Sequence, residues 1–355
     1  MSAARADRLL ELVRGRELDA LLVTSLVDVR WLTGFTGTNG ACVLTGDERL
    51  FLTDFRYVEQ AASQVDGFEI VQAGRDLLGE LAARLPRGHA GFDDAHVNVR
   101  AHARLVERAG TGVELVAAGG LVEQLREVKD AGERERIAAA AELATVTFER
   151  VLERGLVGRT ERAVALDLEH ELRLAGADEP SFPSIVANGA HAALPHAEPR
   201  DAVILPNVLL TVDWGARLDG YCSDCTRTVA TGAVGERERT VYELVLSAQE
   251  MALAAVEPGA GCAAVDGVAR TIIEEAGEGE RFGHGLGHGV GLEVHEGPRL
   301  AKGAEGTLAV GNVVTVEPGV YLPGELGVRI EDLVVVEEGG SRVLTRFPKA
   351  LTVVS

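Results

Sequence analysis

Two similar runs of β-forming residues in the second half of the chain each end in an acid. The run NVLLTVD ends in Asp213 and the run NVVTVE ends in Glu317, and a second acid, Asp224 or Glu331, follows 11 or 14 residues later. The order strand, acid, turn, strand, acid therefore occurs twice, which favours two related halves that face each other across one site. Because the match is short, chance similarity between two buried strands remains an alternative.

The first pair of acids is predicted to lie in a β-hairpin. A turn centred between Leu218 and Asp219 would place Asp213 opposite Asp224 on the neighbouring strand. Cross-strand neighbours lie about 5 Å apart, and two carboxylates at that distance repel each other unless something positive lies between them. The alternative is that one of the two acids points to solvent.

The second pair of acids has a comparable setting. Glu317 closes an apolar run before Pro318, and Glu331 lies inside a strand that we expect over residues 327–336. Arg329 shares the face of Glu331 because side chains alternate with a period of two along a strand. An ion pair between Arg329 and Glu331 is therefore the purely structural explanation of this acid.

A glycine-rich segment, GHGLGHGVGLEVH at residues 283–295, carries three of the nine histidines, His284, His288 and His295. Glycine allows the backbone to approach other groups closely or to turn sharply. Histidine is the commonest metal-binding side chain. Three histidines in such a segment therefore favour a functional role over a structural one.

Charge balance connects these groups. Four carboxylates carry four negative charges, two divalent cations carry four positive charges, and one imidazole adds a neutral ligand. The set is neutral only with two metal ions, which lie about 3.5–4 Å apart in such sites. Oxygen-rich ligands with one nitrogen suit Mn²⁺, with Co²⁺, Zn²⁺ or Fe²⁺ as alternatives. The CxxC pair Cys222 and Cys225 has no second such pair in the sequence, so we expect these thiols to pack structurally and not to bind zinc.

The scaffold that must position these residues is predicted to have two domains, since 355 residues exceed one typical domain. A small α/β domain is expected over residues 1–120, with strands at 20–23, 41–44, 50–53, 68–71 and 90–92. A charged linking helix is expected over 121–135. The second domain follows over 136–355, with helices at 137–151, after Thr160, at 236–256 and at 263–275.

The composition restricts the partners of the protein. A formal net charge of −20 argues against nucleic acid and against anionic membrane surfaces, both of which attract basic proteins. Charged residues interrupt every apolar run near the N-terminus, and no run approaches the length of a membrane span. We therefore expect no secretory signal, no membrane association and a cytoplasmic location.

Taken together, the motifs resemble the creatinase/aminopeptidase superfamily, which has the pita-bread fold. The chain has Asp213, ten residues, Asp224, and then HGLGHGVGLEVHE, VEPGVY and RIED. WLTGFTG and LTDFRY resemble the family's amino-terminal domain, and SFPSIVANGAHAALPH resembles the segment with its first substrate-side histidine. Within the superfamily the chain resembles Xaa-Pro aminopeptidase and prolidase. The resemblance implies a two-domain α/β protein, with a small creatinase-like α/β domain before an α+β pita-bread catalytic domain.

The resemblance implies roles for nine residues. The metal ligands would be Asp213, Asp224, His288, Glu317 and Glu331. Asp224 and Glu331 would bridge the two metal ions. The substrate site would be lined by His196, His284, His295 and Arg329. In catalysis Glu317 would take a proton from water and pass it to the leaving nitrogen, His295 would help to stabilise the oxyanion, and His196 would position the proline-containing part of the substrate.

The resemblance also implies the substrate class, which is proline-containing peptides. The expected activity is that of an Xaa-Pro aminopeptidase; the alternatives are an Xaa-Pro dipeptidase (prolidase) and a catalytically silent peptide-binding protein of the same fold. The Xaa-Pro bond is a tertiary amide without an N–H, which defeats peptidases that recognise that group. Homodimers are usual in this family, and we expect the amino-terminal domain to serve dimerisation or substrate gating. Arg56 and Tyr57 would either reach a neighbouring subunit's site or have a structural role.

Overall fold

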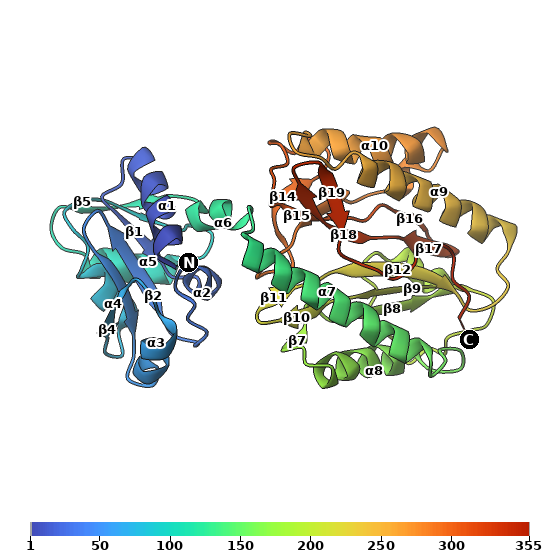
Figure 1. Cartoon of the computed structure of the whole chain (residues 1–355), viewed down its shortest axis with the longest axis horizontal. Coiled ribbons are helices and arrows are strands. Elements are labelled where there is room, and N and C mark those ends of the chain that lie inside the picture. Colours follow the sequence, from blue (N-terminus) through green and yellow to red (C-terminus); the bar gives the residue numbers. More distant parts are fainter. Residues whose placement is uncertain (1, 355) are drawn as a thin grey trace. The chain divides into compact units, whose positions relative to one another are not determined.

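A computed structural model describes residues 2–354 of the chain, which divides after Arg126 into two compact units. Each unit has its own sheets, helices and hydrophobic core (Figure 1). The predicted fold class, an α/β amino-terminal domain followed by a mixed catalytic domain, is confirmed. No helix within residues 2–354 is both long and apolar enough to cross a lipid bilayer.

The amino-terminal unit is built around one mixed six-stranded sheet. Its strands are β1 (Ala20–Val23), β2 (Ala41–Thr45), β3 (Arg49–Thr53), β4 (Glu69–Gln72), β5 (Gly88–Phe92) and β6 (Val113–Ala117). They are ordered β4-β3-β2-β1-β5-β6, and β1 pairs antiparallel with β2 and parallel with β5. The five strands predicted in this domain are all present, and β6 is the one that the sequence pattern missed.

Helices cover both faces of this sheet. They are α1 (Ser2–Gly15), α2 (Leu26–Thr33), α3 (Val58–Gln64), α4 (Leu77–Ala82), α5 (Val99–Arg108) and α6 (Leu121–Arg126). Alternation along β1 points Leu22 into one core with Leu81 of α4 and Leu105 of α5. Ser25 begins α2 by accepting a hydrogen bond from the backbone N–H of Asp28 at 3.4 Å, which places Asp28 in the first turn of that helix.

The expected linking helix over 121–135 is wrong, because two helices occupy this part of the chain. The first, α6, ends at Arg126, and α7 (Ala131–Leu152) opens the second unit. Asp130 accepts a hydrogen bond from the backbone N–H of Glu133, and the Glu133 side chain accepts one from the backbone N–H of Asp130, both at 2.9 Å. This capping box starts a new helix and therefore breaks the predicted one.

The second unit contains two helix pairs with strands between them (Figure 1). The helices are α7, α8 (Glu161–Leu174), α9 (Glu236–Ala254) and α10 (Cys262–Glu275), with short 3₁₀ segments η1 (Gly189–Ala193) and η2 (Gly279–Arg281). Thr160 caps α8 as predicted, by accepting from the backbone N–H of Ala163 at 3.1 Å. The predicted helices at 236–256 and 263–275 are also present.

The strands of the second unit form four small sheets. They are β7 (Glu179–Pro180), β8 (Ile185–Asn188), β9 (Leu209–Trp214), β10 (Ala216–Leu218), β11 (Tyr221–Cys222), β12 (Cys225–Ala230), β13 (Gly287–Gly289), β14 (Glu296–Leu300), β15 (Val313–Val316), β16 (Gly319–Leu322), β17 (Leu326–Arg329), β18 (Asp332–Glu337) and β19 (Gly340–Val343). Their orders are β12-β9-β8, β14-β13-β15-β18-β19, β16-β17 and β11-β10-β7.

Each half of this unit has a core of its own. In the first half, Phe148 of α7 and Leu168 of α8 pack with Trp214 of β9. In the second half, Tyr242 of α9 packs with Val316 of β15. A helix pair on an acid-bearing pair of strands therefore occurs twice, which agrees with the repeat predicted from the two similar runs.

Candidate active site

Asp213 and Asp224 come from one β-hairpin, whose register differs from the expected one. Asp213, in β9, lies opposite Thr226 of β12, and not opposite Asp224. The chain turns at Asp219 and Gly220, which have φ angles of 49° and 79° and form the two-residue turn that suits the twist of a hairpin. The predicted pairing is therefore wrong by two residues. Because side chains alternate with a period of two, Asp224 still lies on the face of Asp213, in the diagonal position.

Glu317 and Glu331 flank the ladder of the second half. Glu317 directly follows β15 and Glu331 directly precedes β18, and these two strands pair antiparallel. The continuous strand predicted over 327–336 is wrong, because β17 pairs with β16 whereas β18 pairs with β15. Glu331 lies at this break, where its backbone N–H donates to the carbonyl oxygen of Thr226 at 3.1 Å. This bond joins the two halves beside the acids.

His288 is the central residue of β13. Its neighbours Gly287 and Gly289 are required there, since a Cβ atom at either position would collide with a backbone carbonyl oxygen of an adjacent strand. Nδ1 of His288 donates to the carbonyl oxygen of Gly289 at 3.0 Å. This bond directs the other ring nitrogen, Nε2, toward the acids, and in the neutral ring this nitrogen has the lone pair that a metal ion would bind.

The five predicted ligands converge on one buried place. Carboxylate oxygens of Asp213, Asp224 and Glu331 lie within 4.8 Å of one another. His288 Nε2 lies 3.7 Å from Asp224 Oδ2 and 3.2 Å from Glu317 Oε1. Asp224 and Glu331 are only 5% and 1% exposed. The two strand pairs and β13 therefore bring four carboxylates and one imidazole together.

The electrostatics of this site favour bound cations. Burial, followed by the charges of the neighbouring carboxylates, raises the pKa of Asp224 and of Glu331 well above the usual values. Asp213 Oδ1 and Glu331 Oε1 are buried and have no hydrogen-bond partner within the part of the chain that the structure describes. Buried carboxylates are stable only when paired or bound to metal. Oxygen ligands with one imidazole nitrogen therefore fit a centre of divalent metal ions.

Arg329 does not form the ion pair with Glu331 that the purely structural explanation of that acid predicted. Its Nη2 donates instead to Asp213 Oδ2 at 2.6 Å, and its Nε donates to Thr226 Oγ1 at 3.0 Å. The Thr226 hydroxyl in turn donates to Glu331 Oε2 at 2.8 Å. Arg329 therefore orients Asp213 directly and reaches Glu331 only through Thr226.

A chain of hydrogen bonds connects Arg329 to His284 through Tyr321. Arg329 Nη1 donates to the Tyr321 hydroxyl oxygen at 3.0 Å, and that hydroxyl donates to His284 Nε2 at 2.9 Å. The other nitrogen of His284, Nδ1, donates to the carbonyl oxygen of Gly285 at 2.8 Å. Burial lowers the pKa of His284, which favours this neutral ring.

The two other histidines predicted to line the substrate site, His295 and His196, are exposed. The His295 ring packs edge-on against the His288 ring, with a centroid distance of 4.4 Å. His196 follows Pro195, whose carbonyl oxygen accepts a hydrogen bond from Arg329 Nη1 at 3.0 Å. The structure therefore places His295 against a predicted ligand, and the residue before His196 against Arg329.

Three residues at the site received no role from the sequence. Thr226 contacts Arg329 and Glu331, Tyr321 joins Arg329 to His284, and the Thr315 hydroxyl donates to Glu317 Oε1 at 3.0 Å. Thr226 and Thr315 lie two residues from Asp224 and Glu317, so the alternation of a strand would have placed them on the same face.

Both cysteines of the CxxC pair are buried. Cys222 and Cys225 are buried free thiols, and burial raises the pKa of both. A protonated thiol is a poor metal ligand, because metals bind the thiolate. Both residues therefore pack beside Asp224 as buried, protonated thiols in the metal-free protein.

Comparison with known proteins agrees with this geometry. Residues 135–338 match metallopeptidase family M24, and residues 5–128 match the creatinase/prolidase N-terminal domain. The chain is 41% identical over 339 residues to the uncharacterized peptidase YqhT of Bacillus subtilis, covering 95% of this chain and 96% of that one.

Two solved structures resemble the chain over almost its full length. The Xaa-Pro dipeptidase from Bacillus anthracis is 36% identical, with a TM-score of 0.95 and coverage of 99% and 100% of the two chains. The X-Pro aminopeptidase from Thermotoga maritima is 35% identical, with a TM-score of 0.90 and coverage of 98% and 99%. Both domains of the chain therefore have counterparts in these structures.

Proposed function

Because the chain belongs to metallopeptidase family M24 and carries a creatinase/prolidase N-terminal domain, we propose that it hydrolyses the Xaa-Pro bond at the N-terminus of peptides. The observation that carries this proposal is the convergence of Asp213, Asp224, His288, Glu317 and Glu331 on one buried centre. The names of similar structures, an Xaa-Pro dipeptidase and an X-Pro aminopeptidase, support the substrate class.

These five residues would hold two divalent metal ions, with Asp224 and Glu331 as the bridging ligands. Such ions, when bound, lower the pKa of water toward neutrality and thereby supply a nucleophile. We propose Mn²⁺ because carboxylate oxygens dominate the ligand set and one imidazole completes it. The Thr226 and Thr315 hydroxyls would hold one oxygen of Glu331 and one of Glu317, which limits how these carboxylates can rotate.

Glu317 would serve as the general base and then as the general acid. Burial by itself disfavours its ionisation, but in the metal-free protein a hydrogen bond from a protonated His288 and nearby positive charge, including that of Arg329, lower its pKa to about 2. The ionised carboxylate would accept a proton from the attacking water. It would then return this proton to the proline nitrogen as the C–N bond breaks. The hydroxyl group of water remains in the new carboxyl group, so that atoms and charge balance.

The residues on the substrate side would bind the groups next to this bond. His295, beside His288, is placed to donate to the oxygen of the tetrahedral intermediate. Arg329 and Tyr321 would fix His284, and His196 would contact the proline-containing part of the substrate. Because Arg329 also holds the Pro195 carbonyl oxygen, it couples the segment before His196 to Asp213.

We favour an aminopeptidase over a dipeptidase. An open hollow of about 780 Å³ borders η1 and the turn between β16 and β17, and its lining includes Leu194, Val203 and Pro323. Leu194 lies two residues before His196 in the sequence, and none of the described residues proposed to bind metal or substrate lines the hollow. We propose that the residues after proline would extend past His196 toward it. The dipeptidase remains the second candidate because the two similar structures carry both names.

Four small substrates would decide between these candidates. The Mn²⁺-loaded protein is incubated with Ala-Pro, Ala-Pro amide, Ala-Pro-Ala and Ala-Ala-Ala, and released alanine is quantified. An aminopeptidase cleaves Ala-Pro-Ala at least as well as Ala-Pro, whereas a dipeptidase cleaves Ala-Pro and rejects the amide and the tripeptide. Cleavage of Ala-Ala-Ala alone would contradict proline specificity. If none is cleaved, the protein is a silent peptide binder; Glu317→Gln serves as the inactive control.

We also propose that the protein is a homodimer and that the amino-terminal unit contributes to the interface or gates the substrate. Phe55 is 76% exposed, an unusual exposure for a large apolar residue. The neighbouring Arg56 is held by Asp54 at 2.7 Å, and the Tyr57 hydroxyl bonds to Thr38 at 2.6 Å, so this loop is ordered. Light scattering after gel filtration should give twice the chain mass, and Phe55→Asp should shift it toward the monomer. A monomeric unsubstituted protein would contradict the proposal.

A further inference from the structure

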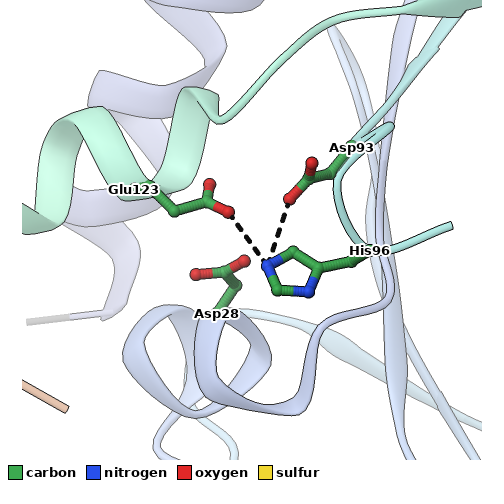
Figure 2. A group of neighbouring side chains, drawn as sticks. All are labelled: Asp28, Asp93, His96 and Glu123. Atoms are coloured by element: carbon green, nitrogen blue, oxygen red, sulfur yellow. Dashed lines mark ion pairs between the residues drawn. The ribbon is translucent and has the colours of Figure 1, made fainter. Parts of the chain in front are cut away.

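A second cluster of metal-type side chains lies in the amino-terminal unit, away from the residues of the proposed active site in the sequence (Figure 2). It consists of Asp28, Asp93, His96 and Glu123, each with one ligand atom within 4.8 Å of the others. Asp28 comes from the first turn of α2, Asp93 and His96 from the segment after β5, and Glu123 from α6. Three separate segments therefore meet at this cluster.

The imidazole of His96 lies at the centre of the contacts. Its Nε2 is 3.6 Å from Asp93 Oδ2 and 3.3 Å from Glu123 Oε1, and Figure 2 shows this nitrogen directed toward both carboxylates. Asp28 and Asp93 are 1% and 9% exposed, whereas the His96 side chain is 38% exposed. The carboxylates are thus fixed in the protein, and the imidazole leaves a route from solvent.

Asp93 provides an independent indication of a ligand. Its Oδ1 accepts a hydrogen bond from the backbone N–H of Ala95 at 2.9 Å. Its Oδ2 is buried, faces the cluster, and has no hydrogen-bond partner among the residues that the structure describes. A buried carboxylate oxygen without a donor is costly, so an ion at this position would remove the cost.

The charge of the cluster is also unbalanced. Three carboxylates meet here, and Asp28 Oδ1 lies 2.6 Å from Nη1 of the Arg126 guanidinium. Burial and the Asp93 and Asp28 carboxylates raise the pKa of Glu123 to about 8, so a proton offsets part of the charge in the metal-free protein. With all three carboxylates ionised, one guanidinium leaves two negative charges, which a divalent cation would neutralise. Both partners of this ion pair are 2% exposed at their side chains, so solvent screens the repulsion weakly.

We propose that Asp28, Asp93, His96 and Glu123 bind one divalent transition-metal ion, such as Zn²⁺, in the amino-terminal unit. Three carboxylates and one imidazole form a four-ligand set of the kind that Zn²⁺ accepts. The imidazole favours a transition metal over Ca²⁺ or Mg²⁺, which take oxygen ligands. Bound metal would tie α6 to α2 and to the segment after β5.

Equilibrium dialysis of the full-length protein against Zn²⁺ tests the site. Metal-stripped samples of the unsubstituted chain, His96→Gln and His89→Gln are dialysed near neutral pH, and zinc per chain is measured by elemental analysis. His89 is the matched control because it is an exposed imidazole 3.5 Å from Glu114 in the same unit. We expect His96→Gln to bind one ion fewer than the other two proteins. This difference does not depend on how many ions the active site holds, so it is independent of the proposed peptidase function.

A second variant and a second readout keep the result interpretable. Asp93→Asn retains the acceptor for Ala95 and removes the charge, and it should also bind one ion fewer. In the unsubstituted protein Zn²⁺ should slow amide hydrogen exchange in residues 121–126 at least tenfold, and this slowing should be absent in His96→Gln. Equal zinc content in His96→Gln, His89→Gln and the unsubstituted chain would overturn the proposal.

Discussion

Arg329 and Asp213 form a buried ion pair that joins the two halves of the catalytic unit. Nη2 of Arg329, at the end of β17, lies 2.6 Å from Oδ2 of Asp213 in β9. The pair engages one oxygen of Asp213, whereas the other, Oδ1, is buried without a hydrogen-bond partner in the described chain. Arg329 therefore determines which oxygen of Asp213 can bind a cation.

Replacing this arginine should weaken metal binding. Arg329→Lys offers one ammonium in place of a planar fork, so it cannot hold Asp213, Tyr321 and Pro195 at once. Partners that orient metal ligands are worth about 10–100-fold in affinity or activity. We expect losses of that size in Mn²⁺ affinity, measured by titration, and in kcat/KM. Arg342→Lys, at an exposed pair with Glu337, is the control. Unchanged Mn²⁺ affinity in Arg329→Lys would contradict the assigned orientation.

Removing Asp224, a proposed bridging ligand, should abolish metal loading and turnover together. Asp224→Ala deletes a side chain that lies among Asp213, Glu331 and His288. We expect kcat/KM to fall by more than about 100-fold, which is the upper end of the loss when a residue that only orients a metal ligand is removed. Asp201→Asn, whose side chain is 78% exposed, should change neither property. Elemental analysis and peptide hydrolysis are measured on the same sample, and turnover by Asp224→Ala without bound metal would refute the mechanism.

The pKa shifts predict how metal removal changes stability with pH. Asp224 and Glu331 have folded pKa values raised above the usual 3.8 and 4.5. Their protonated forms therefore favour the fold below those values, and this contribution is lost as pH rises through the raised pKa values. Bound cations replace the protons, so the gain in Tm on adding Mn²⁺ should be larger at pH 8 than at pH 5.

The pKa of Glu317 shifts in the opposite direction, but this shift does not change stability between pH 5 and pH 8. Its lowered pKa gives a contribution that is present above its usual value of 4.5 and is lost only as pH falls toward about 2. Asp224→Asn, which cannot ionise, should make the Tm of the metal-free protein less dependent on pH. A metal-free unsubstituted protein that becomes more stable from pH 5 to pH 8, relative to Asp224→Asn, would contradict the assignment.

Glu161 should control substrate binding through the segment that carries His196. Its fully buried carboxylate accepts hydrogen bonds from Asn188, His191 and Arg200, which enclose that segment. Glu161→Gln replaces two charged acceptor oxygens by one acceptor and one donor, so part of this network must break. We expect KM to rise about tenfold, as loss of about 1.4 kcal/mol of binding implies, with kcat and metal content nearly unchanged. Glu198→Gln, exposed on the same segment, is the control. A fall in metal content would contradict this role.

The strands and acids of the site could be predicted because their signals are local. The runs that end in Asp213 and Glu317 form β9 and β15. Asp213 is the second-last residue of β9, and Glu317 directly follows β15. The histidine at the centre of a glycine-rich segment became the middle residue of β13. Apolar alternation and glycine placement depend on near neighbours in sequence, so the pattern contains them.

Register and pairing could not be predicted from the same pattern. The hairpin was placed two residues away from its real register because Asp219 and Gly220, both with positive φ, form the turn. The ion pair of Arg329 with Glu331 is the structural alternative that the strand period suggests, whereas the observed partner, Asp213, lies 116 residues away. Strand register and ion-pair partners depend on contacts between elements that are distant in the chain, and local sequence patterns do not reveal these contacts.

The helix boundary at Asp130 could have been recognised. Asp130 and Glu133 have the spacing of a capping box, and their mutual hydrogen bonds begin α7. The many charged residues over 121–135 suggest one continuous helix, although α6 ends and α7 begins within this range. Capping residues therefore locate a helix start better than composition does.

Anomalous diffraction at the manganese edge, from crystals of the Mn²⁺-loaded protein, tests the central proposal most directly. Two peaks about 3.5–4 Å apart are expected among Asp213, Asp224, His288, Glu317 and Glu331, with Asp224 and Glu331 in contact with both. A single peak, or peaks that none of these five side chains contact, would contradict the two-metal site.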